Sequence, residues 1–472
     1  MSAVSTALPG ATELLAGFPI NGVVTDPDIL AAYQRDRELW APSATPLALL
    51  RPRTTEQVAH AMRWASEHRI PVVPRGAGSG LTGAANALVG NVVMSMELMN
   101  TILEVDESDL CAVVQPGVVT SDLKRAAAQR NLFYAPDPSS ADFCTVGGNV
   151  ATNAGGLCCI KYGVTREAIL GLEVVLADGR ILRTGGRTVK NAAGFDLTSL
   201  FVGSEGQLGI VTEVTVRLLP TRTTSATLVA TFADLTSAGQ AVTAIVQSTR
   251  PRMCELMDSV TLHAVEAYRP SGLDMDAAAL LLIQTDGTGS EAEIEHCQTL
   301  CDQAGATFVM TTSDPDEAEM LTVARRIALD ALESQGQWIL EDVCVPLSAV
   351  PRLISGCQQI GSTHGIQVAS FGHAGDGNMH PTLVFPMDDD SARDRARDAS
   401  EEIVRLAMNL GGTITGEHGV GIAKRVKMAD QLGPLNLEVQ RAIKTALDPQ
   451  FILNPGKSLF SDIGGAGLAT YH

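Results

Sequence analysis

Apolar positions along this chain follow two periods, and these periods predict an alternation of strands and helices. Short apolar or alternating runs are typical of strands, whereas apolar side chains at every third or fourth position indicate a helix buried along one face. We expect strands at residues 70–73, 92–96, 210–219, 226–232, 278–285 and 306–312. We expect helices at residues 55–68, 237–249, 290–305, 315–333, 391–409 and 437–447, the first capped by Thr55 and the fifth by Ser391.

The order of these elements predicts four parts. Residues 1–41 form a helical and loop prelude, 42–221 a first module, 222–410 a second module, and 411–472 a C-terminal segment. In the second module, strands and helices alternate as two β-α-β passes with antiparallel returns. This pattern predicts a ferredoxin-like α+β domain.

Composition and charge narrow the class of partner. The chain has 472 residues, 45% of them hydrophobic, so it can bury a large core. A net charge of −19 argues against nucleic acid or an anionic membrane as partner. No apolar run is long enough to span a membrane, and residues 1–22 lack the basic start of a signal peptide, so we expect a cytoplasmic protein. Nine scattered cysteines without the spacing of a ferredoxin cluster predict reduced thiols and no iron–sulfur centre.

The first glycine cluster lies at residues 75–83 and contains a formal G-x-G-x-x-G at Gly78, Gly80 and Gly83. A dinucleotide-binding βαβ unit would need a crossover helix after this motif. Too few residues separate Gly83 from the strand at 92–96, so we reject that interpretation. We expect a loop whose backbone N–H groups face a phosphate directly.

Two more glycine clusters follow, at residues 146–156 and 203–209. Small residues let a backbone segment approach a large flat ligand closely. One such cluster is usually a turn. Three in one module favour a ligand the size of a dinucleotide.

The strongest candidate for chemistry is the segment from His373 to His380, which crosses a Gly-Asp-Gly turn. With residues 366–371 and 381–385 as arms and the turn near Gly377, the segment predicts a hairpin in which the two histidines are cross-strand neighbours on one face. Two imidazoles and the carboxylate of Glu417 would leave coordination positions open on Zn, Mn or Fe, as in a catalytic metal site.

Taken in order, these motifs resemble the vanillyl-alcohol oxidase/p-cresol methylhydroxylase flavoprotein superfamily. Within it, they are similar to the branch of D-lactate dehydrogenases, glycolate oxidase FAD subunits and D-2-hydroxyglutarate dehydrogenases. The specific motifs are Pro74–Gly80, Gly203–Gly206, Gly372–His380 and Gly416–Gly419, and the match covers nearly all the chain after residue 40. The resemblance implies an α+β fold with a two-part FAD-binding domain, a ferredoxin-like cap, and a C-terminal segment that returns to the FAD domain.

The resemblance also implies which residues hold FAD. The pyrophosphate would lie against Pro74, Arg75, Gly76, Ala77, Gly78, Ser79, Gly80, Thr82 and Gly83. The flavin would be lined by Pro138, Ser139, Ser140, Gly147, Gly148, Asn149, Ala154 and Gly155, with Asn454 near the isoalloxazine ring and Gly206, Ile210 and Val211 on the adenine side. No histidine occurs between His68 and His263, so a histidyl bond from the first glycine loop is impossible and we expect noncovalent FAD.

For the reaction, the resemblance implies a divalent metal, Zn or Mn, on His373, His380 and Glu417. A 2-hydroxy acid can chelate such an ion through its carboxylate and hydroxyl, and coordination lowers the pKa of the hydroxyl. His418 resembles the general base that takes the hydroxyl proton while hydride passes from C2 to flavin N5. Asn378 is expected to hydrogen-bond the substrate, and Arg325 to bind its carboxylate.

The substrate expected from these residues is a small monocarboxylate, D-lactate or glycolate. The hydroxyglutarate enzymes resembled here place a lysine on the strand at 338–345, where this chain has none. Two alternatives stay open: a dehydrogenase of D-2-hydroxyglutarate or another longer D-2-hydroxy acid, and an FAD subunit of a glycolate oxidase complex that passes electrons to an iron–sulfur partner. The electron acceptor would be a quinone, a cytochrome, an electron-transfer protein or oxygen. The assembly would be a homodimer or such a complex, cytoplasmic or held peripherally at the membrane through its partner.

Overall fold

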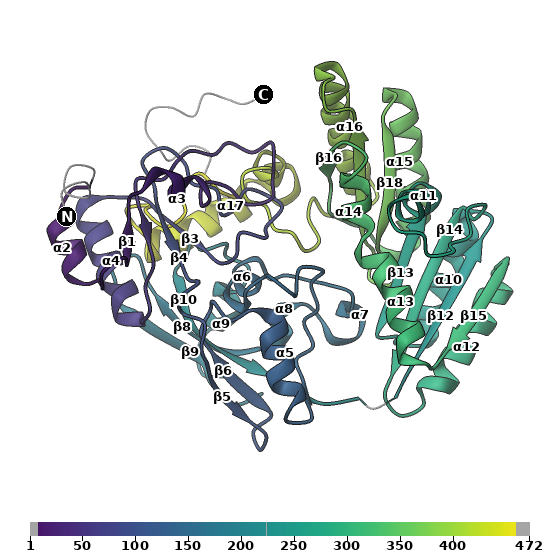
Figure 1. Ribbon diagram of the computed structural model, residues 1–472, viewed down its shortest axis with the longest axis horizontal. Helices are drawn as coiled ribbons and strands as arrows, with labels where there is room; N and C mark the ends of the chain where they lie inside the picture. The colour runs from purple at the N-terminus through teal and green to yellow at the C-terminus, as the bar shows by residue number, and fades with distance from the viewer. Residues whose placement is uncertain (1–7, 223, 459–472) are drawn as a thin grey trace. The chain divides into compact units, whose positions relative to one another are not determined.

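The computed structural model describes residues 8–222 and 224–458 and divides the chain into two compact units (Figure 1). Among the described residues, unit 1 contains 8–154, 164–221 and 418–458, whereas unit 2 contains 155–163, 222 and 224–417. Unit 2 is therefore inserted into the sequence of unit 1. The outer ends of the expected prelude and C-terminal segment, 1–7 and 459–472, lie outside the described residues.

Unit 1 contains two larger sheets. In the four-stranded sheet, ordered β1-β2-β4-β3, the last three strands run parallel. The five-stranded sheet, ordered β5-β6-β10-β8-β9, is antiparallel. Strands β7 and β11 form a separate pair. The strands are β1 (Val23–Val24), β2 (Leu49–Leu50), β3 (Val72–Arg75), β4 (Val92–Ser95), β5 (Ile102–Asp106), β6 (Cys111–Val114), β7 (Leu132–Phe133), β8 (Ile169–Val175), β9 (Ile181–Gly185), β10 (Ile210–Arg217) and β11 (Leu219–Pro220).

The connection from β3 to β4 bears on the first glycine cluster. These strands are parallel neighbours, and residues 76–91 between them contain no helix. This agrees with the rejection of a dinucleotide-binding βαβ unit. The first glycine cluster is thus a loop that leaves the carboxyl end of β3.

The helices of unit 1 are mostly short. Thr54, not Thr55, caps α4: its side chain accepts a hydrogen bond from Gln57 N at 3.3 Å. Gly147 and Gly148 lie in the first turn of α6, so part of the second glycine cluster is helical. The helices are α2 (Ala11–Ala16), α3 (Pro27–Ala31), α4 (Thr55–His68), α5 (Thr120–Ala128), α6 (Val146–Thr152), α8 (Thr165–Ala168), α9 (Leu197–Phe201), η2 (Arg425–Lys427) and α17 (Met428–Leu447).

Residues beyond 417 complete unit 1. Leu453 forms a parallel bridge with Val72 at the free edge of β3, and Val72 N donates to Ile452 O at 2.8 Å. Helix α17 begins at Met428, nine residues before the expected start, and is interrupted at Gly433, where φ is 74° and ψ is 166°. The interruption precedes Pro434, which lacks the N–H that an uninterrupted helix requires.

Unit 2 is built on one antiparallel sheet, ordered β15-β12-β14-β13-β18-β19-β16, with β17 paired to β19. Its first four strands in sequence, with α10 and α12 as the crossover helices, give the expected ferredoxin-like element order, to which α11 adds a helix between β13 and β14. The hairpin β18–β19 and strand β16 extend this sheet. The strands are β12 (Ser225–Phe232), β13 (Met253–Asp258), β14 (Ala279–Asp286), β15 (Phe308–Thr312), β16 (Gln337–Leu340), β17 (Val343–Cys344), β18 (Gln367–His373) and β19 (Asn378–Phe385).

Helices cover both faces of the unit 2 sheet. One layer contains α10, α12, α15 and α16, and the other contains α11, α13 and α14. The expected helix 315–333 is two helices, because Ile327, with ψ of 3°, leaves the helical conformation. Asp389, not Ser391, caps α16. The helices are α7 (Cys159–Tyr162), α10 (Leu235–Ser248), α11 (Ser259–Tyr268), α12 (Ser290–Gln303), α13 (Pro315–Arg326), α14 (Ala328–Glu333), η1 (Leu347–Ala349), α15 (Val350–His364) and α16 (Asp390–Asn409).

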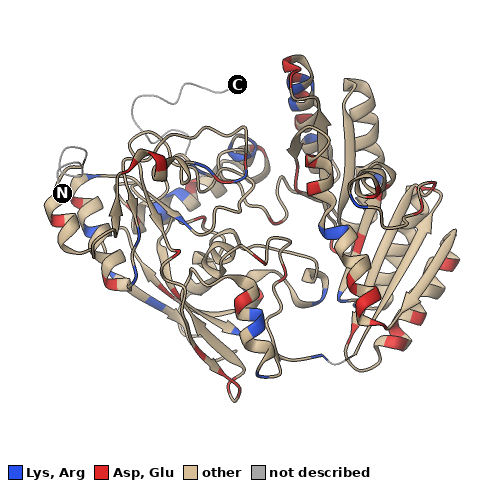
Figure 2. Ribbon diagram, viewed as in Figure 1, with Lys and Arg blue, Asp and Glu red and all other residues tan. Residues whose placement is uncertain are grey.

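The acidic excess and the scattered cysteines noted in the sequence can both be located in the fold. Helix α12 contains four acidic residues and no Lys or Arg (Figure 2), while its Cys297 and Cys301 are fully buried. All nine cysteines lie within the described residues, and none of them forms a disulfide there. Across the described ranges, no helix is both long and apolar enough to cross a membrane.

Candidate active site

The two histidines of the predicted site lie on the hairpin β18–β19 in unit 2. His380 pairs with Phe371 and His373 with Asn378, so the histidines are diagonal rather than directly opposite neighbours. The register differs from the simplest expectation because both arms continue to the edge of the four-residue turn 374–377. The two rings still lie on one face, with centroids 5.2 Å apart.

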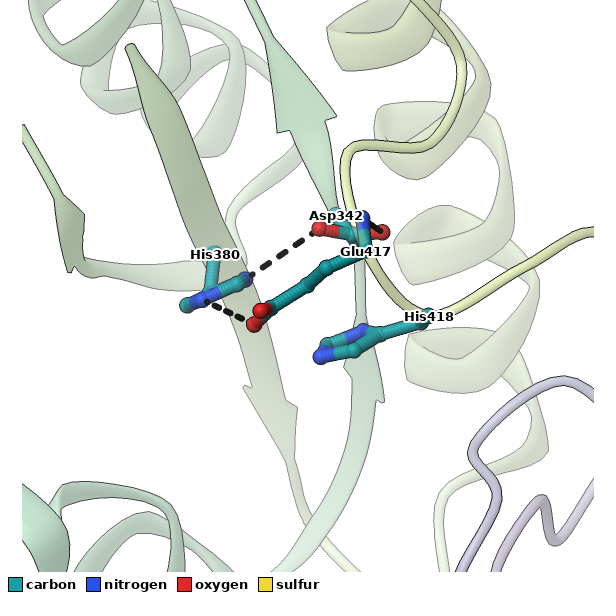
Figure 3. A group of neighbouring side chains, drawn as sticks. All are labelled: Asp342, His380, Glu417 and His418. Atoms are coloured by element: carbon teal, nitrogen blue, oxygen red, sulfur yellow. Dashed lines mark hydrogen bonds and ion pairs between the residues drawn. The ribbon is translucent and has the colours of Figure 1, made fainter. Parts of the chain in front are cut away.

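Glu417 joins the two imidazoles. Its Oε1 atom lies 3.2 Å from Nε2 of His373 and 3.4 Å from Nε2 of His380. Figure 3 shows the carboxylates of Glu417 and Asp342 beside the His380 ring, each joined to it by a dashed line. Three potential ligand groups expected from the sequence are therefore brought together, and His418, also drawn in Figure 3, is the next residue in the chain.

Two carboxylates that the sequence analysis did not select face the other nitrogen of each ring, one at hydrogen-bond distance and one at ion-pair distance. Glu255 Oε1 lies 2.8 Å from Nδ1 of His373, and Asp342 Oδ1 lies 3.6 Å from Nδ1 of His380. Carboxylates in this position orient metal-binding histidines and increase their basicity. The available signal was an acid within an apolar strand: Glu255 stands in Met-Cys-Glu-Leu-Met and is 1% exposed.

Asp342 also fixes the segment that carries Glu417. Its Oδ2 accepts hydrogen bonds from the backbone N–H groups of Gly416 and Glu417, both at 3.0 Å, and from Thr415 Oγ1 at 2.7 Å. Asn378 Nδ2 donates to Asp342 Oδ1 at 2.8 Å and to Val343 O at 3.2 Å. Both amide hydrogens of Asn378 therefore have partners within the protein, so a substrate donor would have to use its Oδ1.

The electrostatics of this group favour a bound cation. Burial alone would lower the pKa of His373, but the charges of Glu255 and Glu417 outweigh it and raise that pKa well above its usual value. Burial raises the pKa of the nearby Asp376 to about 6. Buried carboxylates are costly unless positive charge compensates them, and a divalent ion on histidine and carboxylate ligands would do so. The donor atoms therefore fit Zn or Mn.

Cys159 adds no ligand of this kind. Burial raises the pKa of its thiol, and the charge of Glu417 adds to the shift. Metals bind the thiolate rather than the thiol, so Cys159 is disfavoured as a ligand.

Arg325 lies at the end of α13, on the same side of the sheet as the histidines. Its Nε is 2.8 Å from Glu255 Oε2, and its guanidinium carbon is 4.9 Å from the centroid of the Phe371 ring. The side chain is 3% exposed, yet its Nη2 has no hydrogen-bond partner among the described residues. A buried guanidinium nitrogen without a partner suits a ligand carboxylate.

In unit 1, the expected FAD residues of the three glycine clusters come together. A Cβ on Gly76 would lie 2.4 Å from Oγ1 of Thr145, the cap of α6. A Cβ on Gly206 would lie 2.4 Å from Cγ of Pro74. The first loop therefore lies against both the second and the third cluster.

Arg75 supplies the positive charge in this region. A Cβ on Gly78 would lie 2.0 Å from Nη2 of Arg75, so the guanidinium lies directly beneath the loop. Arg75 is 7% exposed, and its Nη1 has no hydrogen-bond partner within the described part of the chain. This orphaned cationic donor, together with a loop too tight for larger residues, fits the pyrophosphate of FAD.

The remaining residues expected to bind FAD lie in loops, in α6 and in β10. Asn454 Nδ2 donates to Ala84 O at 3.0 Å and to Glu205 O at 2.8 Å, so it joins the first and third clusters. Ile210 begins β10 and is buried in the apolar core, which leaves only its backbone for a ligand. The other placements are Pro138, Ser139 and Ser140 in the loop between β7 and α6, Gly147, Gly148 and Asn149 within α6, Ala154 after it, and Val211 in β10.

Gly155, expected to line the flavin, also lies against Glu417. A Cβ on Gly155 would lie 2.2 Å from Oε2 of Glu417. Within unit 2, its lack of a side chain therefore leaves room for the candidate metal ligand.

Comparison with known proteins identifies two matching regions. Residues 46–185 match the family described as FAD binding domain, and residues 221–458 match FAD linked oxidases, C-terminal domain. The chain is 44% identical to glycolate oxidase subunit GlcD of Bacillus subtilis (strain 168), across 88% of this chain and 90% of that protein. It is 33% identical to D-lactate dehydrogenase of Anaerostipes hadrus, across 94% of each.

A solved structure of similar architecture is p-cresol methylhydroxylase with substrate bound. It aligns with a TM-score of 0.79, covering 95% of this chain and 96% of that chain, at 19% sequence identity. At this identity the likeness concerns the fold, and it agrees with the two-part FAD-binding architecture expected from the sequence.

Proposed function

The chain belongs to the family of FAD-linked oxidases, and from that premise we propose that it is a metal-dependent dehydrogenase of D-lactate or glycolate. The family makes it an FAD-linked oxidoreductase that acts on 2-hydroxy acids. The proposal adds the metal, the roles of individual residues and the small substrate.

The observation that carries the proposal is the convergence of His373, His380 and Glu417. The two Nε2 atoms lie 3.2 and 3.4 Å from one carboxylate oxygen, and buried carboxylates face both Nδ1 atoms. Three protein ligands on one side of an ion leave positions for a chelating substrate, as in a catalytic metal site.

The residues then have separate tasks. When bound, the divalent ion supplies Lewis acidity and FAD supplies the hydride acceptor. Arg325 binds the substrate carboxylate through its free Nη2, which fixes the orientation of C2. His418 accepts the hydroxyl proton on an imidazole nitrogen as the C2–H bond breaks, so the two hydrogens leave as a proton and a hydride.

The charge near the metal group supports a small monocarboxylate. Asp342 is 0% exposed, lies beside His380 and occupies the stretch where the resembled hydroxyglutarate enzymes carry a lysine. A second substrate carboxylate near this acid would be unpaired and repelled. D-lactate and glycolate carry no such group.

FAD is proposed to bind without a covalent bond, through the loops that surround Arg75. Similarity to a glycolate oxidase subunit supports electron transfer to a partner protein. We propose an iron–sulfur subunit as that partner.

The test is anaerobic mixing of the purified holoprotein with D-lactate, L-lactate, glycolate and D-2-hydroxyglutarate, following loss of the visible flavin absorption. We expect D-lactate or glycolate to bleach the flavin. We expect His418→Ala to slow this at least about a hundredfold, because general-base catalysis contributes that much. Removal of metal with a chelator should abolish bleaching, and Zn or Mn should restore it.

Arg180→Ala, which alters an exposed arginine paired with Asp178 between β8 and β9, serves as the control and should reduce at the wild-type rate. Bleaching that survives both His418→Ala and chelation would exclude the proposed mechanism. Preference for D-2-hydroxyglutarate would keep the reaction class but overturn the proposed substrate.

A further inference from the structure

The turn that follows His418 is held by a buried carboxylate from a distant part of unit 1. Glu205 lies in the third glycine cluster, more than 200 residues earlier, and is 8% exposed. Its Oε1 accepts a hydrogen bond from Val420 N at 2.6 Å. Gly421 N donates to Oε1 at 3.2 Å and to Oε2 at 3.1 Å.

Such consecutive backbone N–H groups form an anion-binding concavity, and here the anion is the protein's own carboxylate. The turn suits this role because Gly419 and Gly421 have φ of 81° and 51°. A Cβ on Gly419 would lie 2.3 Å from Glu205 Oε1. The glycine is therefore required both for the backbone conformation and for the close approach of the carboxylate.

Glu205 is itself fixed in place. Its φ of 49° is unusual for a residue with a side chain, and its backbone N–H donates to Ala151 O of α6 at 2.8 Å. The hydroxyl of Ser458 donates to Glu205 Oε2. The carboxylate thus has three donors and a constrained backbone, which makes it a rigid attachment point.

The first glycine cluster also forms hydrogen bonds with this turn, through Thr82. Thr82 O accepts hydrogen bonds from Ile422 N at 2.8 Å and from Ala423 N at 3.1 Å. Thr82 Oγ1 donates to His418 O at 3.5 Å. Residues 418–423 are therefore held by two of the loops that were expected only to bind FAD.

We propose that Glu205 is a positioning residue for the reaction: its carboxylate fixes the Gly419–Gly421 turn and thereby places the imidazole of His418. This inference rests on the proposed function, in which His418 is the general base. Glu205 acts through the backbone of the turn and need not touch substrate. A displacement of a reacting group by about 1 Å can cost about a hundredfold in rate, so a loosened turn should be visible in the kinetics.

The first experiment measures structure and needs no substrate. Amide hydrogen exchange of the holoprotein is followed over residues 418–423 in wild type, Glu205→Gln and Gly419→Ala. In Glu205→Gln, the new NH₂ group cannot accept from Gly421 N, so we expect faster exchange in this peptide. Glu213→Gln, which alters a partly exposed glutamate of β10 paired with Arg183, is the matched control and should exchange like wild type.

The second experiment compares flavin reduction per bound flavin. We expect Glu205→Gln to lower the limiting reduction rate about ten- to a hundredfold, with little change in the substrate concentration at half saturation. In the His418→Ala background, the same substitution should have no further effect, because its action passes through His418. Gly419→Ala should lower the limiting reduction rate in the same way. It provides a second variant for the test if Glu205→Gln binds FAD poorly.

The outcomes separate the two proposals. Wild-type exchange at 418–423 in Glu205→Gln, or an equal further loss of rate in the His418→Ala background, would overturn the role of Glu205. A wild-type protein that no 2-hydroxy acid reduces would refute the proposed function instead, while the exchange experiment would still test the clamp on the turn.

Discussion

At the scale of single residues, the least expected group is a lysine buried at the end of unit 1. Lys457 is fully buried, and its Nζ donates to Asn86 O at 2.7 Å and to Asn454 Oδ1 at 2.9 Å, both neutral oxygens. Burial lowers its pKa to about 7, against partial opposition from the charges of Asp36 and Glu205. The ammonium is thus close to losing its proton near neutral pH.

This shift predicts an unusual pH dependence of stability. Between the folded pKa of about 7 and the ordinary lysine pKa of about 10.4, the unfolded chain holds a proton that the folded protein lacks, so stability rises with pH. From pH 7 to 9, we expect the free energy of unfolding of wild type to rise by on the order of 2 kcal/mol relative to Lys457→Met. Urea titrations at the two pH values measure this difference. Lys190→Met, at an exposed lysine, is the control, and parallel pH curves for wild type and Lys457→Met would contradict the shift.

The two candidate histidine ligands could be recognised from the sequence because they lie close together in the chain. His373 and His380 flank a turn, and the residue types alone indicate metal chemistry. Glu255 and Asp342 could not be paired with them in this way, because strand order in the folded sheet decides which buried acid reaches which ring. The same limit applies to Glu205, whose partners lie more than 200 residues away.

At the scale of elements, the hairpin β18–β19 determines the geometry of the candidate metal group. Its tight turn depends on Gly377, which has φ of 85°, and a Cβ there would lie 2.1 Å from Val345 O. The hairpin was predictable from its two apolar arms and its glycines. Its register was not, because the ends of the arms depend on pairing with β13, β16 and β17.

Gly377→Ala should therefore destabilise the protein and weaken metal retention together. Gly272 provides a matched control, since its φ of 73° is similar but a Cβ there would meet nothing within 4 Å. We expect Gly377→Ala to cost about 1–3 kcal/mol more than Gly272→Ala, because only the former also displaces a backbone carbonyl. Urea unfolding and metal content after dialysis are the measurements. Equal losses in the two variants would mean that the close approach to Val345 is unimportant.

At the scale of the whole molecule, the expected cofactor groups are divided between the units. Arg75 and the residues of the first and third glycine clusters belong to unit 1, whereas His373, His380 and Glu417 belong to unit 2. The fold class, the ferredoxin-like order and the rejection of a crossover helix after β3 were all accessible from the sequence. The sequence did not predict that residues 155–163 belong to unit 2, because no change in composition marks this segment.

Because the two expected sites lie in different units, we expect metal and FAD each to slow amide hydrogen exchange in a different set of peptides. Adding Zn or Mn to metal-free protein should slow exchange in peptides covering 367–385 and 413–417, and adding FAD to flavin-free protein should slow it at 75–83 and 145–154. A ligand at a hundred times its Kd stabilises its binding unit by about 2.7 kcal/mol, which suffices for a clear change. His380→Ala should abolish the effect of metal but preserve that of FAD. Protection of the glycine clusters by metal alone would contradict the assignment.

The insertion of unit 2 into unit 1 also has a consequence for synthesis on the ribosome. At roughly 5–20 residues per second, translation of residues 222–417 takes roughly 10–40 seconds. Throughout that interval β3 lacks Leu453 at its free edge, and the turn held by Glu205 does not yet exist. The nascent first half therefore displays an unpaired strand edge, a natural substrate for chaperones. Flavin incorporation should be among the last events of biogenesis, so messages truncated after residue 417 would yield a protein that folds its cap yet remains colourless.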